Sequence, residues 1–184
     1  MGYGKKVLRP YTSHRLMHSI ADTRTEMHCK QRSHRPLGHH DTEYLSMVGE
    51  DYFGAYAGYP IDLELKEFGD GGIDYDTWEV GTVDVKTLVH PYALLVEYKE
   101  YRKHPLANIL VLCGYSEKRD EAYFRGWATG AEILGRPHWK HPMQVDNHEI
   151  VADKLHPIEE LWQMFDEAHG YAQEANEQLV LFGG

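Results

Sequence analysis

The chain has 184 residues, of which 42% are hydrophobic, and it carries a formal net charge of −10. This length and composition predict one globular domain with appendages and a sizeable core. No apolar run reaches the about 18 residues of a membrane-spanning helix, and the start of the chain lacks the apolar core of a signal peptide. The two cysteines match no disulfide framework, so the sequence predicts a cytoplasmic protein without membrane contact.

Residues 1–40 differ from the rest of the chain in charge, with a net of +6 against −16 for the remainder. They predict a basic, His-rich arm that either contacts DNA phosphates or packs on the protein's own acidic surface. The candidate phosphate contacts in this arm are Lys5, Lys6, Arg9 and Arg15. A short helix is expected over Thr12–Arg24. A zinc site is an alternative use of the arm, although the spacing is irregular, through His28, Cys29, His34, His39 and His40.

The central domain is predicted to span residues 41–156 and to begin with a helix over Asp41–Ala57, where apolar residues recur near helical spacing. Glu50 lies on one flank of this helix together with Glu43, because seven residues make nearly two turns. The alternation of apolar and polar residues over Ile61–Phe68 predicts a half-buried strand.

A glycine-rich turn then leads into two predicted strands, Ile73–Val80 and Thr82–Leu88. Because side chains alternate across a strand, Asp84 and Lys86 should point to the same face. An acid on the neighbouring strand would bring two carboxylates and one ammonium together, and carboxylate oxygens suit hard divalent cations such as Mg²⁺. Asp74 is the preferred second acid, and its rivals are Asp70 and Asp76.

Further along, Tyr92–Tyr101 is ambiguous, and Leu106–Gly114 is apolar enough for a central buried strand. Another strand is expected over Tyr123–Ala128, followed by the short helix Gly130–Leu134 with Thr129 as its cap. Arg125 is a candidate phosphate contact, or an ordinary surface arginine. A Pro-bounded loop could contact nucleic acid through His138, Trp139 and His141. Residues 157–177 predict an acidic helix with one apolar face.

The segment Gly71-Gly72-Ile73-Asp74, followed by Asp84-Val85-Lys86, resembles the active-site core of the PD-(D/E)XK nuclease superfamily, of phage and bacterial type. The resemblance covers residues 42–160, with Ile73 in place of the proline and Asp84 at a position often filled by glutamate. It implies an α/β, restriction-endonuclease-like fold, in which a mixed β-sheet is flanked by helices. The alternative is a solvated acidic hairpin that contains the Asp-x-Lys triplet by chance.

The same resemblance implies a metal-dependent DNA endonuclease that uses Mg²⁺ or Mn²⁺ in recombination, repair or replication. The metal ligands would be Asp74, Asp84, Glu50 and the Val85 carbonyl, and Lys86 would position the attacking water. Two alternatives stay open. One is a DNA-binding protein that keeps the fold without cutting, and the other is a Holliday-junction-type resolvase, which requires a homodimer.

The last seven residues, 178–184, predict a partner. The pattern Gln-Leu-x-Leu-Phe resembles the short peptide by which bacterial replication and repair proteins bind the sliding clamp. It implies contacts through Gln178, Leu179, Leu181 and Phe182. The alternative is a terminal strand or a tail that folds onto the domain.

Overall fold

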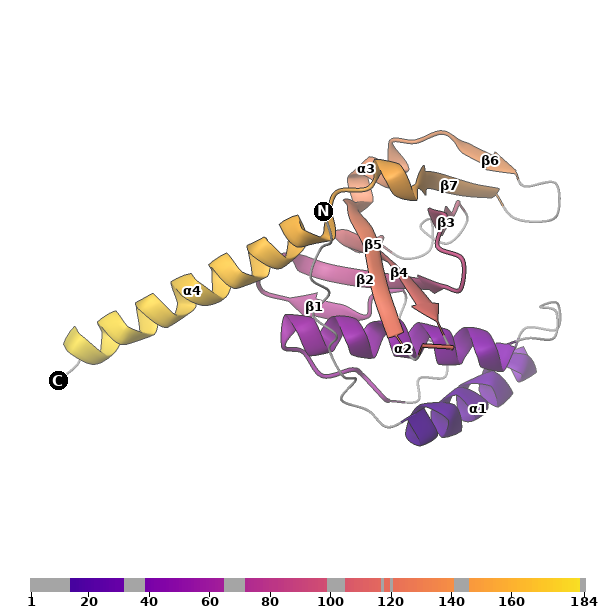
Figure 1. Cartoon of the computed structure of the whole chain (residues 1–184), viewed down its shortest axis with the longest axis horizontal. Helices are drawn as coiled ribbons and strands as arrows, with labels where there is room; N and C mark the ends of the chain where they lie inside the picture. The colour runs from indigo at the N-terminus through magenta and orange to yellow at the C-terminus, as the bar shows by residue number, and fades with distance from the viewer. Residues whose placement is uncertain are drawn as a thin grey trace.

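The computed structural model of the protein (Figure 1) describes the residues 14–31, 39–64, 72–98, 105–116, 118–119, 121–140 and 146–182. Several predicted residues lie outside this part of the chain: Lys5, Lys6, Arg9, His34, Asp70 and His141. The side chains of the other zinc candidates are also outside it, so the zinc alternative stays a prediction.

A four-stranded mixed sheet forms the centre of the molecule, in the order β1-β2-β4-β5. The β1–β2 and β4–β5 pairs are antiparallel, and the β2–β4 pair is parallel. These strands are β1 (Tyr75–Thr77), β2 (Gly81–Leu88), β4 (Ile109–Ser116) and β5 (Glu121–Thr129). Helices flank this sheet, and the predicted α/β class with a mixed sheet is therefore confirmed.

The two faces of the central sheet bury different clusters. Odd-numbered residues of β2 and β4, such as Val85 and Val111, pack against α2 (His39–Ala57) and the first turns of α4 (Ile158–Phe182). Leu110 and Leu112 point the other way because side chains alternate along a strand, and they pack beneath a second sheet. Seven of the eight residues of β4 are buried, so the predicted central strand is confirmed.

The second sheet is antiparallel, in the order β3-β7-β6, and it was not expected. Its strands are β3 (Ala93–Glu97), β7 (Asp146–Val151) and β6 (His138–Lys140). Residues 138–140 were predicted to be loop, but they form a strand because they pair with β7. Pairing between β3 and β7, some fifty residues apart, leaves no local signal in the sequence.

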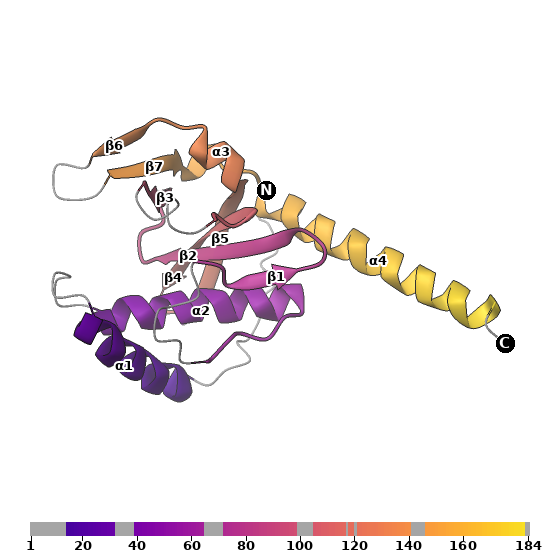
Figure 2. The same ribbon diagram turned by 180° about the vertical axis from the view of Figure 1, so that it is seen from behind.

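The helix of the predicted basic arm is longer than expected and belongs to the folded body. α1 (His14–Gln31) packs along α2, as Figure 2 shows, and buries Met17 and Ala21 completely. Arg15, a candidate phosphate contact, lies exposed on α1. In the described part of residues 1–40, α1 therefore contributes side chains both to the hydrophobic core and to the surface.

The strand predicted over Ile61–Phe68 is wrong for its described residues, 61–64, which form no strand. The guanidinium of Arg24 donates to the Asp62 and Glu64 carbonyls, at 3.1 and 3.5 Å. Ile61 and Leu63 pack against the α1–α2 cluster instead of a sheet. The apolar residues of this segment thus pack on helices, and its backbone carbonyls bond to the Arg24 side chain of α1 instead of to a neighbouring strand.

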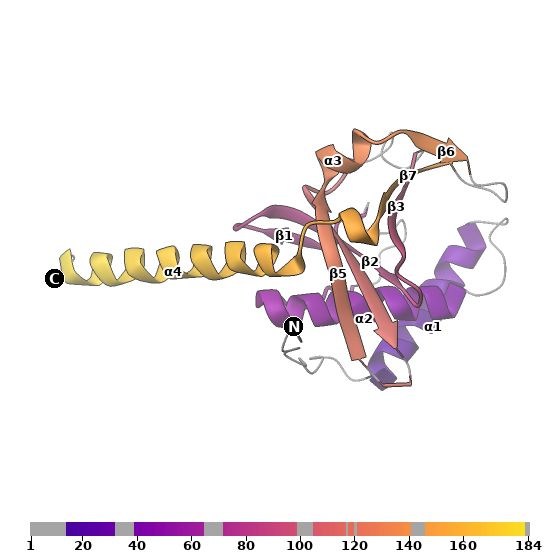
Figure 3. The same cartoon turned by 45° about the horizontal axis from the view of Figure 1, so that its top comes forward.

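Among the α4 residues whose side chains the structure describes, those of the first turns pack on the body, with Leu161 and Phe165 buried, and His169 Nε2 lies 2.6 Å from Glu79 Oε1. Figure 3 shows the remainder standing away from the body. The helix continues beyond the predicted boundary at residue 177, so the backbone of Gln178–Phe182 is helical, while the side chains there lie outside the described part. In the part of the chain that the structure describes, no helix combines the length and apolar character needed to cross a membrane.

Candidate active site

The β1–β2 hairpin carries Asp74, and β1 is shorter than the predicted strand Ile73–Val80. Asp74 N–H donates to the Val83 carbonyl at 2.9 Å, but its carboxylate Oδ2 accepts from Val85 N–H at 2.6 Å. The carboxylate thus takes the Val85 N–H, which would donate to a backbone carbonyl in a regular strand pair. Regular pairing with β2 therefore begins only at Tyr75. The strand β1 ends at Thr77, whose hydroxyl donates to the Gly81 carbonyl at 2.7 Å.

Asp84 and Lys86 form the second half of the site, on β2. The register pairs Tyr75 with Val83, so Asp74 lies one position further along, across from Asp84. Asp84 is only 3% exposed, and its Oδ2 lies 2.8 Å from Lys86 Nζ. The Lys86 side chain is 38% exposed, so the ion pair reaches from the interior to solvent.

Glu50 comes to the site from α2, which packs on β2 at unusually close range. A Cβ on Gly49 would overlap the Thr87 hydroxyl, so only glycine allows the helix to lie this near the strand. Glu50 is 8% exposed. The Tyr75 hydroxyl donates to the Glu50 backbone carbonyl at 2.6 Å, which ties this turn of α2 to the strand after Asp74.

The electrostatics of the site are dominated by negative charge. Burial raises the pKa of Asp74 well above its usual value, and the nearby charges of Glu50 and Asp84 raise it further. The Val85 amide and the Lys86 ammonium lower the same pKa, but they do not offset these effects. The Asp74 carboxyl group is thus stabilised when it binds a proton or a cation. Carboxyl groups with strongly raised pKa values are frequent at functional sites.

The donor atoms suit a hard divalent cation, because Asp74, Asp84 and Glu50 supply carboxylates and Val85 a carbonyl. Within the described residues, however, no three His, Cys, Asp or Glu side chains are arranged to hold a metal ion. The carboxylates are already engaged, with Asp84 on Lys86 and Asp74 on the Val85 amide. Metal binding would therefore require these side chains to exchange partners.

The faces of the sheet explain this arrangement. Asp84 shares its face with Leu110 and Leu112, toward the second sheet, whereas Glu50 belongs to the helix on the opposite face. The Asp74 carboxylate lies between them, because it bonds to the backbone of β2. Asp76, its rival, is exposed in β1 and is not among the groups that shift the pKa of Asp74.

Three residues near the site were not predicted: Ser46, Asp51 and Tyr75. Asp51 is fully buried. Burial raises the pKa of Tyr75, and the charges of Glu50, Asp74 and Asp51 raise it further. The Ser46 hydroxyl donates to Glu50 Oε1 at 3.0 Å. The four-residue spacing of Ser46 and Glu50 on a predicted helix was a signal that could have identified this contact.

The other predicted DNA contacts lie away from this site. Arg125 is exposed on β5, at the opposite edge of the sheet from β1, and its guanidinium is 3.4 Å from an Asp153 carboxylate oxygen. On β6, His138 Nδ1 is 2.8 Å from Asp146, and the Trp139 indole N–H donates to Glu149 at 2.7 Å. These aromatic groups are thus held by acids of β7.

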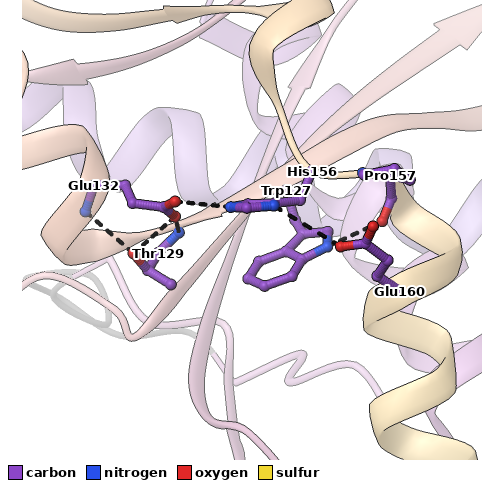
Figure 4. Close-up of polar contacts among 6 residues, drawn as sticks. All are labelled: Trp127, Thr129, Glu132, His156, Pro157 and Glu160. Atoms are coloured by element: carbon purple, nitrogen blue, oxygen red, sulfur yellow. Dashed lines mark hydrogen bonds and ion pairs between the residues drawn. The ribbon is translucent and has the colours of Figure 1, made fainter.

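A second polar cluster, which we call the α4 junction, joins β5, α3 (Gly130–Leu134) and the start of α4 (Figure 4). Trp127 exchanges two backbone hydrogen bonds with His156, at 3.0 and 2.9 Å, and its indole N–H donates to the Pro157 carbonyl at 3.0 Å. His156 Nε2 lies 2.7 Å from Glu132 Oε1. Glu132 also forms the predicted cap of α3 with Thr129, and the Thr129 amide and His156 lower the pKa of Glu132 to about 2.

Comparison with known proteins identifies no relative. No protein-family model matches the chain, and no curated protein or solved structure does. The functional assignment therefore depends on the geometry of the Asp74–Asp84 site and on the resemblance of its sequence.

Proposed function

We propose that the protein is a metal-dependent deoxyribonuclease with a restriction-endonuclease-like fold, which hydrolyses phosphodiester bonds within DNA. One observation carries the proposal. The two halves of the sequence motif, Asp74 and Asp84, lie across from each other on neighbouring chain segments, with Glu50 and Lys86 close enough to change the pKa of Asp74. A solvated acidic hairpin would not bury Asp84 or draw a helix glutamate to its edge.

Each residue has a distinct part in this proposal. Asp74, Asp84 and Glu50 would hold Mg²⁺ or Mn²⁺, together with the Val85 carbonyl. Such a cation, when bound, would stabilise charge on the scissile phosphate and acidify a water. The high pKa of Asp74 means that cation binding competes with a proton at this carboxyl.

Lys86 is suited to orient the attacking water, because its side chain is 38% exposed and Asp84 fixes its ammonium at 2.8 Å. An ammonium that shifts from the carboxylate to a water would keep that water beside the phosphate and assist its deprotonation. No covalent intermediate is required.

DNA is the proposed partner, although the chain carries a net charge of −10. Basic residues are concentrated in residues 1–40, which have a net charge of +6, and contacts from this segment would position phosphate groups. Bound cations would offset part of the acidity at the site itself.

The decisive experiment is a cleavage assay with Mg²⁺ and Mn²⁺ on linear, nicked, branched and single-stranded DNA. Wild-type protein should cut at least one substrate only when metal is present, and Lys86→Ala should be at least about 100-fold slower. Lys154→Ala removes an exposed lysine from the 3₁₀ turn Ala152–Lys154 and serves as the matched control with wild-type activity. Cleavage by Lys86→Ala at the wild-type rate would overturn the mechanism, and a wild type that cuts none of the substrates would overturn the function.

We also propose a bacterial sliding clamp as a partner, through Gln178, Leu179, Leu181 and Phe182. The support is the direction of α4, which carries this end of the chain away from the central sheet in Figures 1 to 3. The apolar residues would enter a pocket of the clamp as anchors. Unwinding the last helical turn for this purpose costs little, because helix ends fray.

The clamp proposal is tested by the affinity of the full-length protein for a bacterial clamp. Replacing Leu181 and Phe182 with alanine should abolish binding, whereas Glu174→Ala, outside the motif, should preserve it. Equal binding of the double variant and wild type would contradict the proposal and leave the nuclease assignment intact.

A further inference from the structure

Glu50 is held at two points by hydroxyl groups that are not in the predicted ligand set. Ser46 Oγ donates to the carboxylate oxygen Oε1 at 3.0 Å, and the Tyr75 hydroxyl donates to the backbone carbonyl at 2.6 Å. One contact orients the side chain, and the other fixes the helical turn that carries it. Together they define where a flexible glutamate can place its charge.

The Ser46 contact is specific to this carboxylate. A serine within a helix commonly bonds to the carbonyl one turn earlier, which satisfies its hydroxyl locally. The Ser46 hydroxyl instead donates forward, to a side chain four residues later on the same helix face. Hydrogen bonds to an ionised acceptor are about twice as strong as neutral ones, so this contact can select one rotamer of Glu50.

The close packing of α2 makes that rotamer consequential. Gly49 sets the distance between the helix and β2, and Glu50 follows it directly in the chain. Glu50 is 8% exposed, and its charge acts on Asp74. Freeing a buried glutamate from its hydrogen bond would let it adopt other rotamers, and a bound cation would then have to order the side chain again.

We infer that Ser46 is a positioning residue, whose hydroxyl fixes the rotamer of the Glu50 carboxylate and thereby sets the affinity of the site for a divalent cation. The inference rests on the proposed function, because Glu50 is a cation ligand only within it. It goes further by assigning a role to a residue outside the ligands, comparable to the outer partners that orient ligands in other metal sites.

The test is a calorimetric titration of the full-length protein with Mn²⁺, without DNA. Ser46→Ala should bind Mn²⁺ about 10-fold more weakly than wild type, in line with the loss of an orienting partner. Ser46→Thr keeps a hydroxyl and should restore most of the affinity. The matched control is Ser19→Ala, an exposed serine of α1, which should bind as wild type does.

A double-mutant cycle separates positioning from a general effect on the fold. In a Glu50→Gln background, Ser46→Ala should cause little further loss, because the hydroxyl has no carboxylate left to orient. An equal loss in both backgrounds would overturn the inference. If Ser46→Ala does not fold, as judged by circular dichroism, Ser46→Cys replaces it in the test. The S–H group is a weaker hydrogen-bond donor than the hydroxyl, so this variant should also bind Mn²⁺ more weakly than wild type.

The possible failures are distinguishable. If wild type binds Mn²⁺ and Ser46→Ala binds it equally well, the inference is wrong and the proposed function stands. If wild type binds no Mn²⁺ and cuts no DNA, the proposed function fails, and the inference fails with it.

Discussion

Two carboxyl groups of this protein show opposite responses to their surroundings. At the candidate site, burial and then the charges of Glu50 and Asp84 raise the pKa of Asp74. At the α4 junction, hydrogen bonds from Thr129 and His156 lower the pKa of Glu132 to about 2. The buried Asp74 carboxylate has few hydrogen-bond donors around it, whereas the Glu132 carboxylate has several.

The difference agrees with the function proposed for the Asp74–Asp84 site. A junction that only holds elements together is most stable when every polar atom is paired, as around Glu132. A cluster that keeps like charges together lowers stability, and such an arrangement persists where it serves a ligand or a reaction. Four predictions test this contrast, in order of decreasing effect.

The largest effect is expected from Gly49→Ala, which should disrupt the candidate site and leave the junction intact. Its methyl group would overlap the Thr87 hydroxyl, so α2 must shift, at a cost of about 3 kcal/mol in the free energy of unfolding. Gly170→Ala on α4 is the control, because nothing lies within 4 Å of the added atom. The control should gain about 1 kcal/mol from helix propensity. Urea unfolding measures both, and equal stabilities would show that α2 does not need its close approach.

The next pair of variants should change stability in opposite directions. Asp74→Asn removes a disfavoured charge and keeps an oxygen that can accept from Val85 N–H, so it should gain about 1 kcal/mol while losing metal-dependent activity. Glu132→Gln removes the charge that faces His156 in an exposed setting, where screening limits the loss to less than about 1 kcal/mol. Thermal unfolding at neutral pH gives both signs, and a destabilised Asp74→Asn would contradict the contrast.

The pH dependence of stability should separate the same two groups. The pKa of Glu132 falls from 4.5 to about 2 on folding, so its contribution is present above pH 4.5 and is lost as the pH falls toward about 2. Asp74 behaves in the opposite way, because its raised pKa makes the folded state favour the protonated form, and the penalty disappears at low pH. The stability difference between wild type and Glu132→Gln should therefore shrink between pH 4.5 and pH 2. A constant difference over that window would refute the role of the Glu132 charge.

The smallest effect is expected from Arg125→Ala, close to the α4 junction. The guanidinium and the Asp153 carboxylate are 3.4 Å apart and both exposed, so the pair should contribute less than about 0.5 kcal/mol. The unfolding midpoint in urea measures this, and a larger loss would mean that exposed ion pairs, and not only the paired groups around Glu132, hold the junction. Unchanged DNA affinity of the same variant would remove Arg125 from the candidate phosphate contacts.

Local patterns in the sequence predicted much of what surrounds the site. The period of two along β2 placed Asp84 and Lys86 on one face, where they form an ion pair. The apolar run of β4 predicted a buried central strand, and the cap of α3 by Thr129 followed from residue type and position. In each case, residues a few positions apart in the chain carry the whole signal.

Contacts between distant segments were beyond the reach of such patterns. The pairing of β3 with β7 produced a second sheet. Residues 61–64, the described part of the strand that apolar alternation had predicted over Ile61–Phe68, form no strand, and the Arg24 guanidinium donates to the Asp62 and Glu64 carbonyls. The approach of α2 to β2 depends on Gly49, and no local pattern indicated that this glycine would lie against Thr87 of the strand.

The sequence by itself determined the residue types of the site, because Asp84 and Lys86 lie on one strand and Asp74 at the end of a glycine-rich turn. Only the tertiary structure decided how their charges balance. The Val85 amide donates to the Asp74 carboxylate at 2.6 Å, and the packing of α2 on the sheet brings the charge of Glu50 close enough to raise the pKa of Asp74. The physical reason is that alternation and helical spacing act between neighbours in the chain, whereas burial and Coulomb interactions depend on distances in space.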